Sequence, residues 1–277
     1  MNSALGSADL YSESSGPGAA APLVLLHGWG MNLRVFDRLR AALAERHRVT
    51  AIDLAGHGKS AWTSGSSPQQ QLARLAAVLP RDAVLVGWSL GGQLALQLAA
   101  EPALAVRQLV LIATSPRFVC ADDWPHGLPA ATLRQFAAQL AHDAGQTTDD
   151  FIELQLRGSA DAAAVRAALQ DALRLHGAAE PAALAAGLEL LEHNDLRALA
   201  RRIEVPALVV AGQYDRVTEA QAGQALAQLL PQAQLLNIRR AGHAPFLSHP
   251  GQVAAAMLAF TRQDAAPPRT AASSASL

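Results

Sequence analysis

Short apolar segments alternate with amphipathic segments along most of the 277-residue chain. Six runs of strand length are rich in valine, leucine, isoleucine and alanine: 22–26, 49–53, 83–87, 109–113, 207–212 and 234–238. Such runs are typical of parallel strands that are buried on both faces. Segments with the 3.6-residue period of helices separate them: 35–45, 69–79, 91–101, 219–230 and 252–260. This alternation predicts an α/β fold with a doubly wound, mostly parallel sheet.

The alternation stops between about residue 117 and residue 200. This stretch shows only helical periodicity, in four segments: 130–141, 148–157, 161–175 and 181–192. An all-helical insertion in such a sheet is most simply a cap over the carboxyl ends of the strands, where ligands bind in α/β folds. We therefore predict an α/β core of residues 21–116 and 201–263 with a helical cap at 117–200. We expect a flexible lead-in at residues 1–20, with a short edge strand as the alternative for part of it, and a disordered tail at 264–277.

Composition narrows the class of protein. Hydrophobic residues make up 51% of the chain and charged residues 16%, so a large buried core is readily formed. The net charge of -1 argues against nucleic-acid binding, which requires a clustered basic face.

Cys120 is the only cysteine, which excludes an internal disulfide. The first residues lack the features of a signal peptide, and no apolar run reaches the roughly 18 residues that span a bilayer. We expect a cytoplasmic monomer that binds no membrane.

The strongest chemical motif follows the third predicted strand. Gly87-Trp88-Ser89-Leu90-Gly91 has the form G-x-S-x-G between a strand and a helix. A sharp strand-to-helix turn exposes the serine hydroxyl to a base and a substrate, but it crowds the backbone and favours glycine two positions before and after. Ser89 is therefore the candidate nucleophile. The backbone N–H of Leu90, at the start of the helix, can hold a developing oxyanion.

A second oxyanion donor is expected in the loop after the first predicted strand, which ends in His27-Gly28-Trp29. In folds with this serine turn, that loop supplies a backbone N–H, and we assign the donor to Trp29. His27 is expected to hold the loop by hydrogen bonds. Asp53 and His57 follow the next strand, but without a third ligand they do not predict a metal site. The glycine spacings match no nucleotide-binding motif, so no cofactor is expected.

A carboxylate and a histidine follow the last two predicted strands. Asp215 lies after the fifth strand and His243 after the sixth, so the chain order is serine, acid, histidine, as expected for this kind of nucleophile. His243 would accept the Ser89 proton, while Asp215 would orient the imidazole and stabilise its charged form. Glu219 or Asp195 would be the alternative acid. Four other histidines fall in polar helical contexts and are expected on the surface: His47, His142, His176 and His193.

These motifs resemble those of the α/β-hydrolase superfamily over nearly the whole of residues 22–262. Several segments are more specifically similar to those of the pimeloyl-[acyl-carrier protein] methyl ester esterases of biotin synthesis. They are His27-Gly-Trp-Gly30, Gly87-Trp-Ser-Leu-Gly-Gly92, His243-Ala-Pro-Phe-Leu-Ser-His-Pro250, Ser115-Pro-Arg-Phe118 with Asp123-Trp-Pro125, and Gly187-Leu-Glu-Leu-Leu191 with Asp195-Leu-Arg197. The last two groups lie in or beside the predicted cap, where α/β hydrolases share little, so they are the more specific.

The resemblance implies an α/β-hydrolase fold and a serine carboxylesterase that hydrolyses the methyl ester of a carrier-bound pimeloyl chain. Trp29, Ser89, Leu90 and His243 match the acyl-site positions of that family, and residues 151–155 match its substrate-facing cap segment. An aliphatic chain also favours apolar walls. The expected substrate-binding residues are therefore Trp29, Trp88, Phe118, Phe151 and Gln155.

The charge of the predicted cap departs from what docking of an acidic acyl carrier protein would favour. Residues 117–197 contain six arginines, no lysine and twelve acidic residues, a net charge of about -6. Two aspartates come directly before Phe151. Three arginines could still form one basic helical face: Arg157, Arg166 and Arg174.

Other activities use the same three residues. A hydrolase of small esters or lactones and a cofactor-free haloperoxidase would share the triad, so the sequence leaves them open. Haloalkane dehalogenase chemistry is excluded, because it needs a carboxylate where this chain has Ser89. A non-catalytic binding protein on this scaffold is not expected, because such proteins usually lose a triad residue and this chain has all three.

Overall fold

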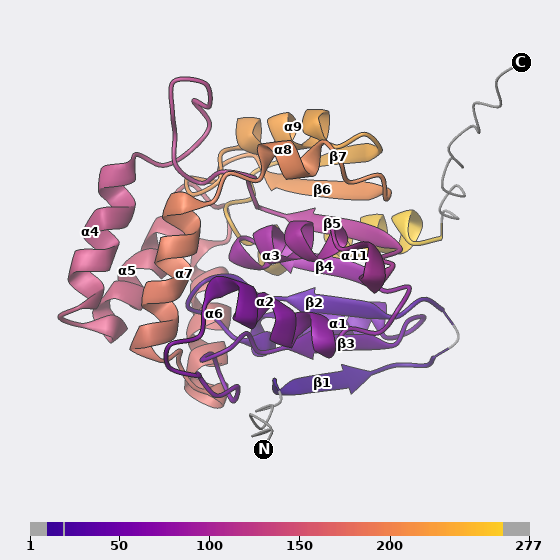
Figure 1. Ribbon diagram of the computed structural model, residues 1–277, viewed down its shortest axis with the longest axis horizontal. Helices are drawn as coiled ribbons and strands as arrows, with labels where there is room; N and C mark the ends of the chain where they lie inside the picture. Colours follow the sequence, from indigo (N-terminus) through magenta and orange to yellow (C-terminus); the bar gives the residue numbers. More distant parts are fainter. Residues whose placement is uncertain (1–9, 19, 263–277) are drawn as a thin grey trace, which may run out of the picture.

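The computed structural model describes residues 10–18 and 20–262, and its strands form a single sheet. The spatial order of the strands is β1-β3-β2-β4-β5-β6-β7 (Figure 1). All neighbours are parallel except β1, which pairs antiparallel with β3 at one edge. The prediction of a mostly parallel, doubly wound sheet is confirmed. The strands are β1 (Ser12–Ser15), β2 (Leu23–Leu26), β3 (Val49–Ile52), β4 (Val84–Trp88), β5 (Gln108–Ile112), β6 (Ala207–Gly212) and β7 (Ala233–Ile238).

β1 lies within the segment that we expected to be a flexible lead-in. Its sequence is Ser-Glu-Ser-Ser, and its side chains alternate between exposed and half-buried, so it lacks the apolar signal of the inner strands. Backbone pairing with β3 holds it at the edge of the sheet. The rest of that expectation, for residues 1–9 and 19, and the tail expected at 264–277 lie outside the described residues.

Helices cover both faces of the sheet. Leu23 and Leu25 of β2 pack into the core on one face, whereas Val24 and Leu26 pack into the core on the other. Because both faces are buried, nearly every position of an inner strand must be apolar, which is the pattern of the sequence. The covering helices are α1 (Asp37–Leu43) and α11 (Pro250–Phe260) on the first face, and α2 (Pro68–Ala77), α3 (Leu90–Ala99), α8 (Arg197–Ala200) and α9 (Ala220–Leu229) on the second.

Short helical turns join the longer elements. The helix predicted at 35–45 begins as a 3-10 turn, η1 (Leu33–Phe36), which runs directly into α1. η2 (Pro102–Leu104) precedes β5, and α10 (Pro245–Ser248) follows the loop after β7. None of the helices in the described ranges is long and apolar enough to cross a membrane.

Four helices form the cap, which stands at the carboxyl ends of the parallel strands (Figure 1). The expected all-helical insertion is thus confirmed. One helix begins at Ala144, before the predicted start at 148, because the Asp143 side chain accepts a hydrogen bond from the Gln146 backbone N–H and caps it. The cap helices are α4 (Ala130–Leu140), α5 (Ala144–Leu156), α6 (Ala162–His176) and α7 (Pro181–His193).

A buried histidine–aspartate hydrogen bond joins α6 to the core. His176 Nε2, at the end of α6, lies 2.7 Å from Asp53 Oδ2, in the loop after β3. Asp53 also accepts hydrogen bonds from the backbone N–H groups of Leu33 and Lys59. The expectation that His176 and His47 lie on the surface is therefore wrong, since both are buried. Local polarity was misleading because the partner of His176 comes from a distant part of the chain.

Candidate active site

The chain turns sharply between β4 and α3, and Ser89 lies at this turn. Its φ of 55° and ψ of -118° are angles that residues other than glycine rarely adopt. Packing around the turn is tight: a Cβ at Gly87 would lie 2.3 Å from Gly91 O, and one at Gly91 would lie 2.2 Å from Leu26 O. Both glycines are therefore required for steric reasons, as the G-x-S-x-G pattern predicts.

His243 and Asp215 meet Ser89 at the carboxyl edge of the sheet. His243 Nε2 lies 3.0 Å from Ser89 Oγ, and His243 Nδ1 lies 2.8 Å from Asp215 Oδ2. Because a carboxylate accepts hydrogen bonds, the imidazole carries its proton on Nδ1 and presents the Nε2 lone pair to the serine hydroxyl. This arrangement can remove the hydroxyl proton as the oxygen attacks a carbonyl carbon.

A turn after β6 holds Asp215, and it includes a residue that the sequence analysis missed. Asp215 Oδ1 accepts hydrogen bonds from the backbone N–H groups of Val217 and Thr218, at 2.8 and 2.9 Å. Asp215 Oδ2 accepts one from the Thr218 hydroxyl at 2.7 Å. The available signal was local, since Asp and Thr side chains often close such turns.

The alternative acids lie elsewhere. Glu219 is exposed just before α9. Asp195 Oδ2 lies 2.6 Å from Arg197 Nη2. The hydrogen bonds from Arg197 lower the pKa of Asp195 to about 2. Arg197 also binds Asp123 at 2.9 Å. These ion pairs join the segment before the cap helices to the segment after them, which gives Asp195 a structural role.

Two backbone N–H groups adjoin the serine. Leu90 begins α3 directly after Ser89. Gly28 approaches Ser89 so closely that a Cβ on the glycine would lie 3.2 Å from Ser89 Cβ, which brings the loop of Trp29 to the nucleophile. Within the described part of the chain, neither the Trp29 nor the Leu90 N–H has a hydrogen-bond partner. Both groups are available to a developing oxyanion.

His27 holds the Trp29 loop, as expected. Its Nδ1 donates to Gly28 O at 2.8 Å, and its Nε2 accepts from Leu54 N at 2.9 Å. Burial is the main cause that lowers the pKa of His27 well below 6.5, and the nearby His57 lowers it further. The ring therefore stays neutral and keeps both hydrogen bonds. Over the ranges described, no group of three or more His, Cys, Asp or Glu side chains is arranged to hold a metal ion.

An apolar cluster lies between the core and the cap. Trp29, Leu90, Phe118 and Phe151, all expected at the site, belong to it. The Trp29 ring packs edge-to-face on Phe151 with 4.9 Å between ring centroids, and its Nε1 donates to Leu184 O of α7 at 2.8 Å. The structure therefore brings these four residues together in one buried apolar cluster, to which the neighbour of Ser89, Leu90, belongs.

The other two expected substrate-binding residues contact His243 instead. The Trp88 and His243 rings pack with 5.7 Å between their centroids, and Trp88 Nε1 donates a hydrogen bond to His243 O at 2.8 Å. Trp88 thus supports the histidine from within the core. Gln155 is buried on α5, and its backbone carbonyl accepts from His243 N at 3.4 Å. Its side-chain Oε1 and Nε2 are buried without a partner among the described residues, so they can bind a polar group of a ligand.

The closed cap isolates the site from solvent. Ser89 is 1% exposed, Asp215 3% and His243 0%. Such burial strengthens the electrostatic interactions of the triad and excludes water. It also means that cap side chains or helices must move before a substrate can reach Ser89.

Known proteins share this fold and site. Residues 21–250 match the family model of the alpha/beta hydrolase fold. An esterase from Exiguobacterium antarcticum superimposes with a TM-score of 0.81 over 92% of this chain and 96% of that chain, at 22% identity. A hydrolase from Pseudomonas aeruginosa PA01 gives a TM-score of 0.73 over 91% and 93% of the two chains, at 29% identity. Fold and site together define an α/β hydrolase with a serine–histidine–aspartate triad.

Curated relatives are closer in sequence. The pimeloyl-[acyl-carrier protein] methyl ester esterase of Nitrosomonas europaea is 41% identical over 245 residues, which cover 88% of this chain and 96% of that protein. That of Nitrosospira multiformis is 37% identical over 268 residues, covering 93% of this chain and 100% of that protein. The chain belongs to the family of the pimeloyl-[acyl-carrier protein] methyl ester esterases.

Proposed function

We propose that this protein hydrolyses the methyl ester of pimeloyl-acyl carrier protein, releasing methanol and freeing the terminal carboxylate for biotin synthesis. The observation that carries the proposal is the approach of His243 Nε2 to 3.0 Å from Ser89 Oγ. It occurs in a chain that is 41% identical to an esterase of that name over nearly the full length of that protein.

The first half of the reaction forms an acyl-enzyme. Ser89 Oγ attacks the ester carbonyl carbon while His243 Nε2 takes the hydroxyl proton. The carbonyl oxygen gains negative charge, which the N–H groups of Trp29 and Leu90 stabilise; one such donor is worth about 3–4 kcal/mol of barrier. The intermediate then expels methoxide, which leaves as methanol with the proton from His243. Asp215 stabilises the transient imidazolium of His243 by accepting a hydrogen bond from its Nδ1.

The second half restores the enzyme. A water molecule takes the place of methanol and attacks the acyl carbon while His243 accepts its proton. The tetrahedral intermediate collapses, and His243 returns the proton to Ser89 Oγ. The products are the free enzyme and a pimeloyl chain that ends in a carboxylate.

The apolar cluster supports an aliphatic acyl chain as substrate. Trp29, Phe118 and Phe151 provide large apolar surfaces, and such surfaces favour a hydrocarbon chain over a polar one. The unpartnered amide of Gln155 supplies a polar contact for an ester or amide oxygen of the substrate.

Docking of the carrier requires basic residues, and the basic face expected on the cap is largely neutralised. Arg166 pairs with Glu153, and Arg174 pairs with Asp171 at 3.0 Å. Arg157 lies after the end of α5 and not on α6 with the other two. The helical face of the cap is therefore a poor match for an acidic partner.

A second group of arginines, which shares Arg157 with that face, adjoins the triad, and we assign carrier docking to it. Within the described residues, none of them makes an ion pair, so their positive charge is free to attract an acidic surface. These four rim arginines are exposed and flank Asp215, His243 and the end of α5: Arg157, Arg216, Arg239 and Arg240.

Contacts between loops support treating the rim arginines as one surface. Ala160 N, just beyond α5, donates to Arg240 O at 3.1 Å. Gly158 packs on the loop of Asp215, since a Cβ there would lie 3.2 Å from Tyr214 Cβ. Tyr214 N in turn donates to Ala241 O at 2.8 Å. The rim arginines thus surround the seam where the cap meets the two loops that carry the acid and the base.

Charge reversal tests this docking surface. Arg157→Glu with Arg240→Glu should lower kcat/KM for pimeloyl-acyl carrier protein methyl ester about tenfold or more, and leave kcat/KM for free dimethyl pimelate within about twofold. The matched control is Arg46→Glu with Arg201→Glu, because these exposed arginines precede β3 and β6 at the opposite edge of the sheet. Equal losses in the two double variants would contradict docking at the rim arginines.

Competing turnover tests the function itself. The wild-type protein should prefer pimeloyl-acyl carrier protein methyl ester over a short p-nitrophenyl ester supplied at the same concentration, and Ser89→Ala should abolish both activities. The wild-type gene should also restore growth of a biotin auxotroph that lacks this esterase, whereas Ser89→Ala should not. A decisive preference for the short ester would replace the proposal with a general small-ester hydrolase.

A further inference from the structure

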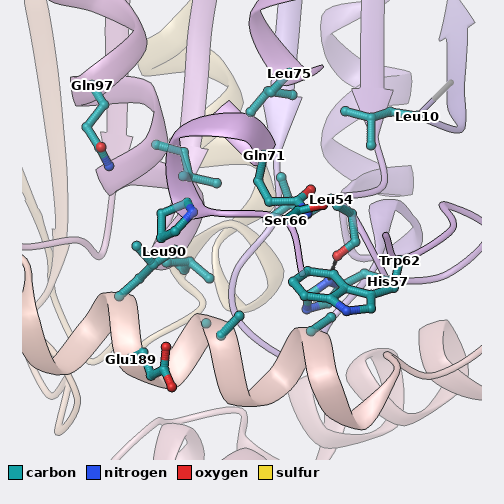
Figure 2. A pocket seen from close by; sticks show the side chains of 17 residues that line it. Leu10, Leu54, His57, Trp62, Ser66, Gln71, Leu75, Leu90, Gln97 and Glu189 are labelled. Atoms are coloured by element: carbon teal, nitrogen blue, oxygen red, sulfur yellow. Dashed lines mark hydrogen bonds between the residues drawn. The ribbon is translucent and has the colours of Figure 1, made fainter. Parts of the chain in front are cut away.

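A cavity of about 120 Å³ lies between the core and the cap, beside α2 and α3 (Figure 2). α2, α3 and the loop after β3 form one side of it, and α7 forms the other. Its walls are mainly apolar, which favours a hydrocarbon ligand. The apolar lining includes Leu54, Leu75, Leu90, Leu94, Ala183 and Leu190.

The cavity is separate from the triad but shares a wall with the site. Ser89, Asp215 and His243 do not line it. Leu90 and Gly187 do, and they also border the Trp29 side: a Cβ at Gly187 would lie 2.6 Å from Trp29 Cδ1 and 3.4 Å from Leu90 Cδ2. A ligand here would contact the residue next to the nucleophile without touching the nucleophile.

The loop after β3 holds α7 against the cavity. Glu180 N, just before α7, donates to Gly56 O at 2.7 Å, and Glu180 Oε1 accepts from Trp62 N at 3.3 Å. Gly56 has φ +71°, and a Cβ there would lie 2.4 Å from Ala183 Cβ, so the loop backbone touches the helix. Close, hydrogen-bonded packing of this loop against α7 thus forms one wall of the cavity, and the exposed Pro68 and Glu189 lie at its open side.

Two buried polar atoms, on residues that line this cavity, have no hydrogen-bond partner among the described residues: His57 Nε2 and Gln71 Nε2. His57 is 3% exposed, and its Nδ1 donates to Ala55 O at 3.0 Å, which leaves Nε2 as an acceptor. Burial lowers the pKa of His57, so this lone pair persists at neutral pH. Gln71 Oε1 accepts from Arg74 at 3.2 Å, whereas Gln71 Nε2 is a donor.

We propose that this cavity binds a small, neutral, largely hydrocarbon molecule that carries one hydroxyl group. The hydroxyl donates to His57 Nε2 and accepts from Gln71 Nε2, while the hydrocarbon part contacts the leucines. Figure 2 shows these two side chains with Ser66 and Trp62 toward one end of the cavity, and Leu90 toward the other. An apolar cavity of roughly 150 Å³ holds benzene, so this one accommodates about six heavy atoms.

Three probes with the same five-membered ring test the proposal: cyclopentanol, cyclopentanone and cyclopentylammonium. Each is titrated at pH 7.5 into full-length protein with labelled methyl groups, and binding is followed by NMR. Cyclopentanol should give saturable shifts of the Leu54, Leu75 and Leu94 methyls. Its affinity should be at least about fivefold higher than that of cyclopentanone, which cannot donate to His57. Cyclopentylammonium should bind at least about fivefold more weakly than cyclopentanol, because its charge must leave water and the one carboxylate that lines the cavity, Glu189, is itself exposed to solvent.

Substitutions locate the binding. Ala186→Leu projects into the cavity and should weaken cyclopentanol binding about tenfold or more, whereas Ala185→Leu, on the exposed side of α7, should leave it unchanged. Gln71→Leu removes the donor and should weaken cyclopentanol and cyclopentanone alike by about fivefold, whereas the exposed Gln69→Leu should not.

Several results would overturn the proposal. They are equal affinities for the three probes, shifts centred on other methyl groups, or cyclopentanol binding that survives Ala186→Leu. Failure of cyclopentanol to saturate would also overturn it and would indicate that the two polar atoms bind water alone. The methyl spectrum and hydrolysis of a p-nitrophenyl ester confirm that each variant is folded.

Discussion

At the residue scale, one carboxylate oxygen controls the alignment of the base. Asp215 Oδ2 accepts hydrogen bonds from both the Thr218 hydroxyl, at 2.7 Å, and His243 Nδ1, at 2.8 Å. Thr218 Oγ1 itself lies 3.4 Å from His243 Nδ1. The threonine hydroxyl, together with the two backbone N–H groups on Oδ1, therefore holds the carboxylate in the rotation that directs His243 Nε2 toward the serine.

Thr218→Val should lower kcat about tenfold and leave KM nearly unchanged. The substitution keeps the shape of the side chain but removes a hydrogen bond to a charged group, which is typically worth about 1.5–3 kcal/mol. Thr218→Ser retains the hydroxyl and should restore most of the activity. Steady-state kinetics with a p-nitrophenyl ester measures both variants. A serine variant as slow as the valine variant would show that the methyl group, and not the hydroxyl, matters here.

Sequence reasoning identified the triad and missed this threonine for a physical reason. Ser89, Asp215 and His243 each follow a strand, and parallel strands bring their carboxyl ends to one edge of the sheet, so chain order alone brings them together. Thr218 has no chemistry of its own that singles it out. Its role is visible only once its hydroxyl is located on Asp215 Oδ2.

At the scale of elements, the cap helices are fastened to the core in different ways. α6 is held by the buried pair of His176 and Asp53, and by Asn32 Nδ2, which donates to the carbonyls of Ala172 and Gly177 at 2.9 Å. α7 is held by the hydrogen bond from Trp29 Nε1 to its backbone and by the hydrogen bonds of Glu180, at its start, with Gly56 and Trp62. Because the contacts of His176 and Asn32 are buried, whereas Glu180 is exposed, we expect α6 to stay on the core when the cap opens for substrate.

His176→Leu should destabilise the folded protein by about 1–3 kcal/mol, because Asp53 loses its buried side-chain partner and keeps only the backbone N–H groups of Leu33 and Lys59. His142→Leu changes an exposed histidine and should alter the free energy of unfolding by no more than about 0.5 kcal/mol. Urea denaturation followed by circular dichroism measures both. Similar midpoints for the two variants would mean that the pair does not fasten the cap.

The periodicity of apolar residues predicted the inner strands and the cap helices, because burial on two faces or on one imposes a distinct pattern. The periodicity did not reveal elements and residues that are held by hydrogen bonds to a distant partner and not by burial of apolar side chains. β1 is polar and is held by backbone hydrogen bonds to β3. His176 reads as a surface residue because its helix is locally polar, and its partner Asp53 is 123 residues away in the chain.

At the scale of the whole molecule, buried neutral histidines make folding sensitive to acid. Burial lowers the pKa of both His27 and His57 below the ordinary value of 6.5. Below pH 6.5 these two histidines therefore bind protons in the unfolded chain but stay unprotonated in the folded chain. Stability is fully present above that pH and falls as the pH decreases from 6.5 toward the lowered values of the folded state.

The free energy of unfolding should accordingly decrease between pH 7.5 and pH 5.5. Urea titrations at several pH values measure the slope. His57→Gln should make the decrease shallower, because it removes one of the two groups, whereas the exposed His142→Gln should leave the slope unchanged. A steeper decrease in His57→Gln would contradict the linkage.

The most direct test of the account is the labelling of Ser89 by a fluorophosphonate, followed by mass spectrometry of the digested protein. The folded wild-type protein should gain one adduct, on Ser89, and His243→Ala should slow the labelling by about a thousandfold or more, because the serine then lacks its base. An adduct on another residue, or equal labelling rates in the wild type and His243→Ala, would contradict the assignment of a histidine-activated serine.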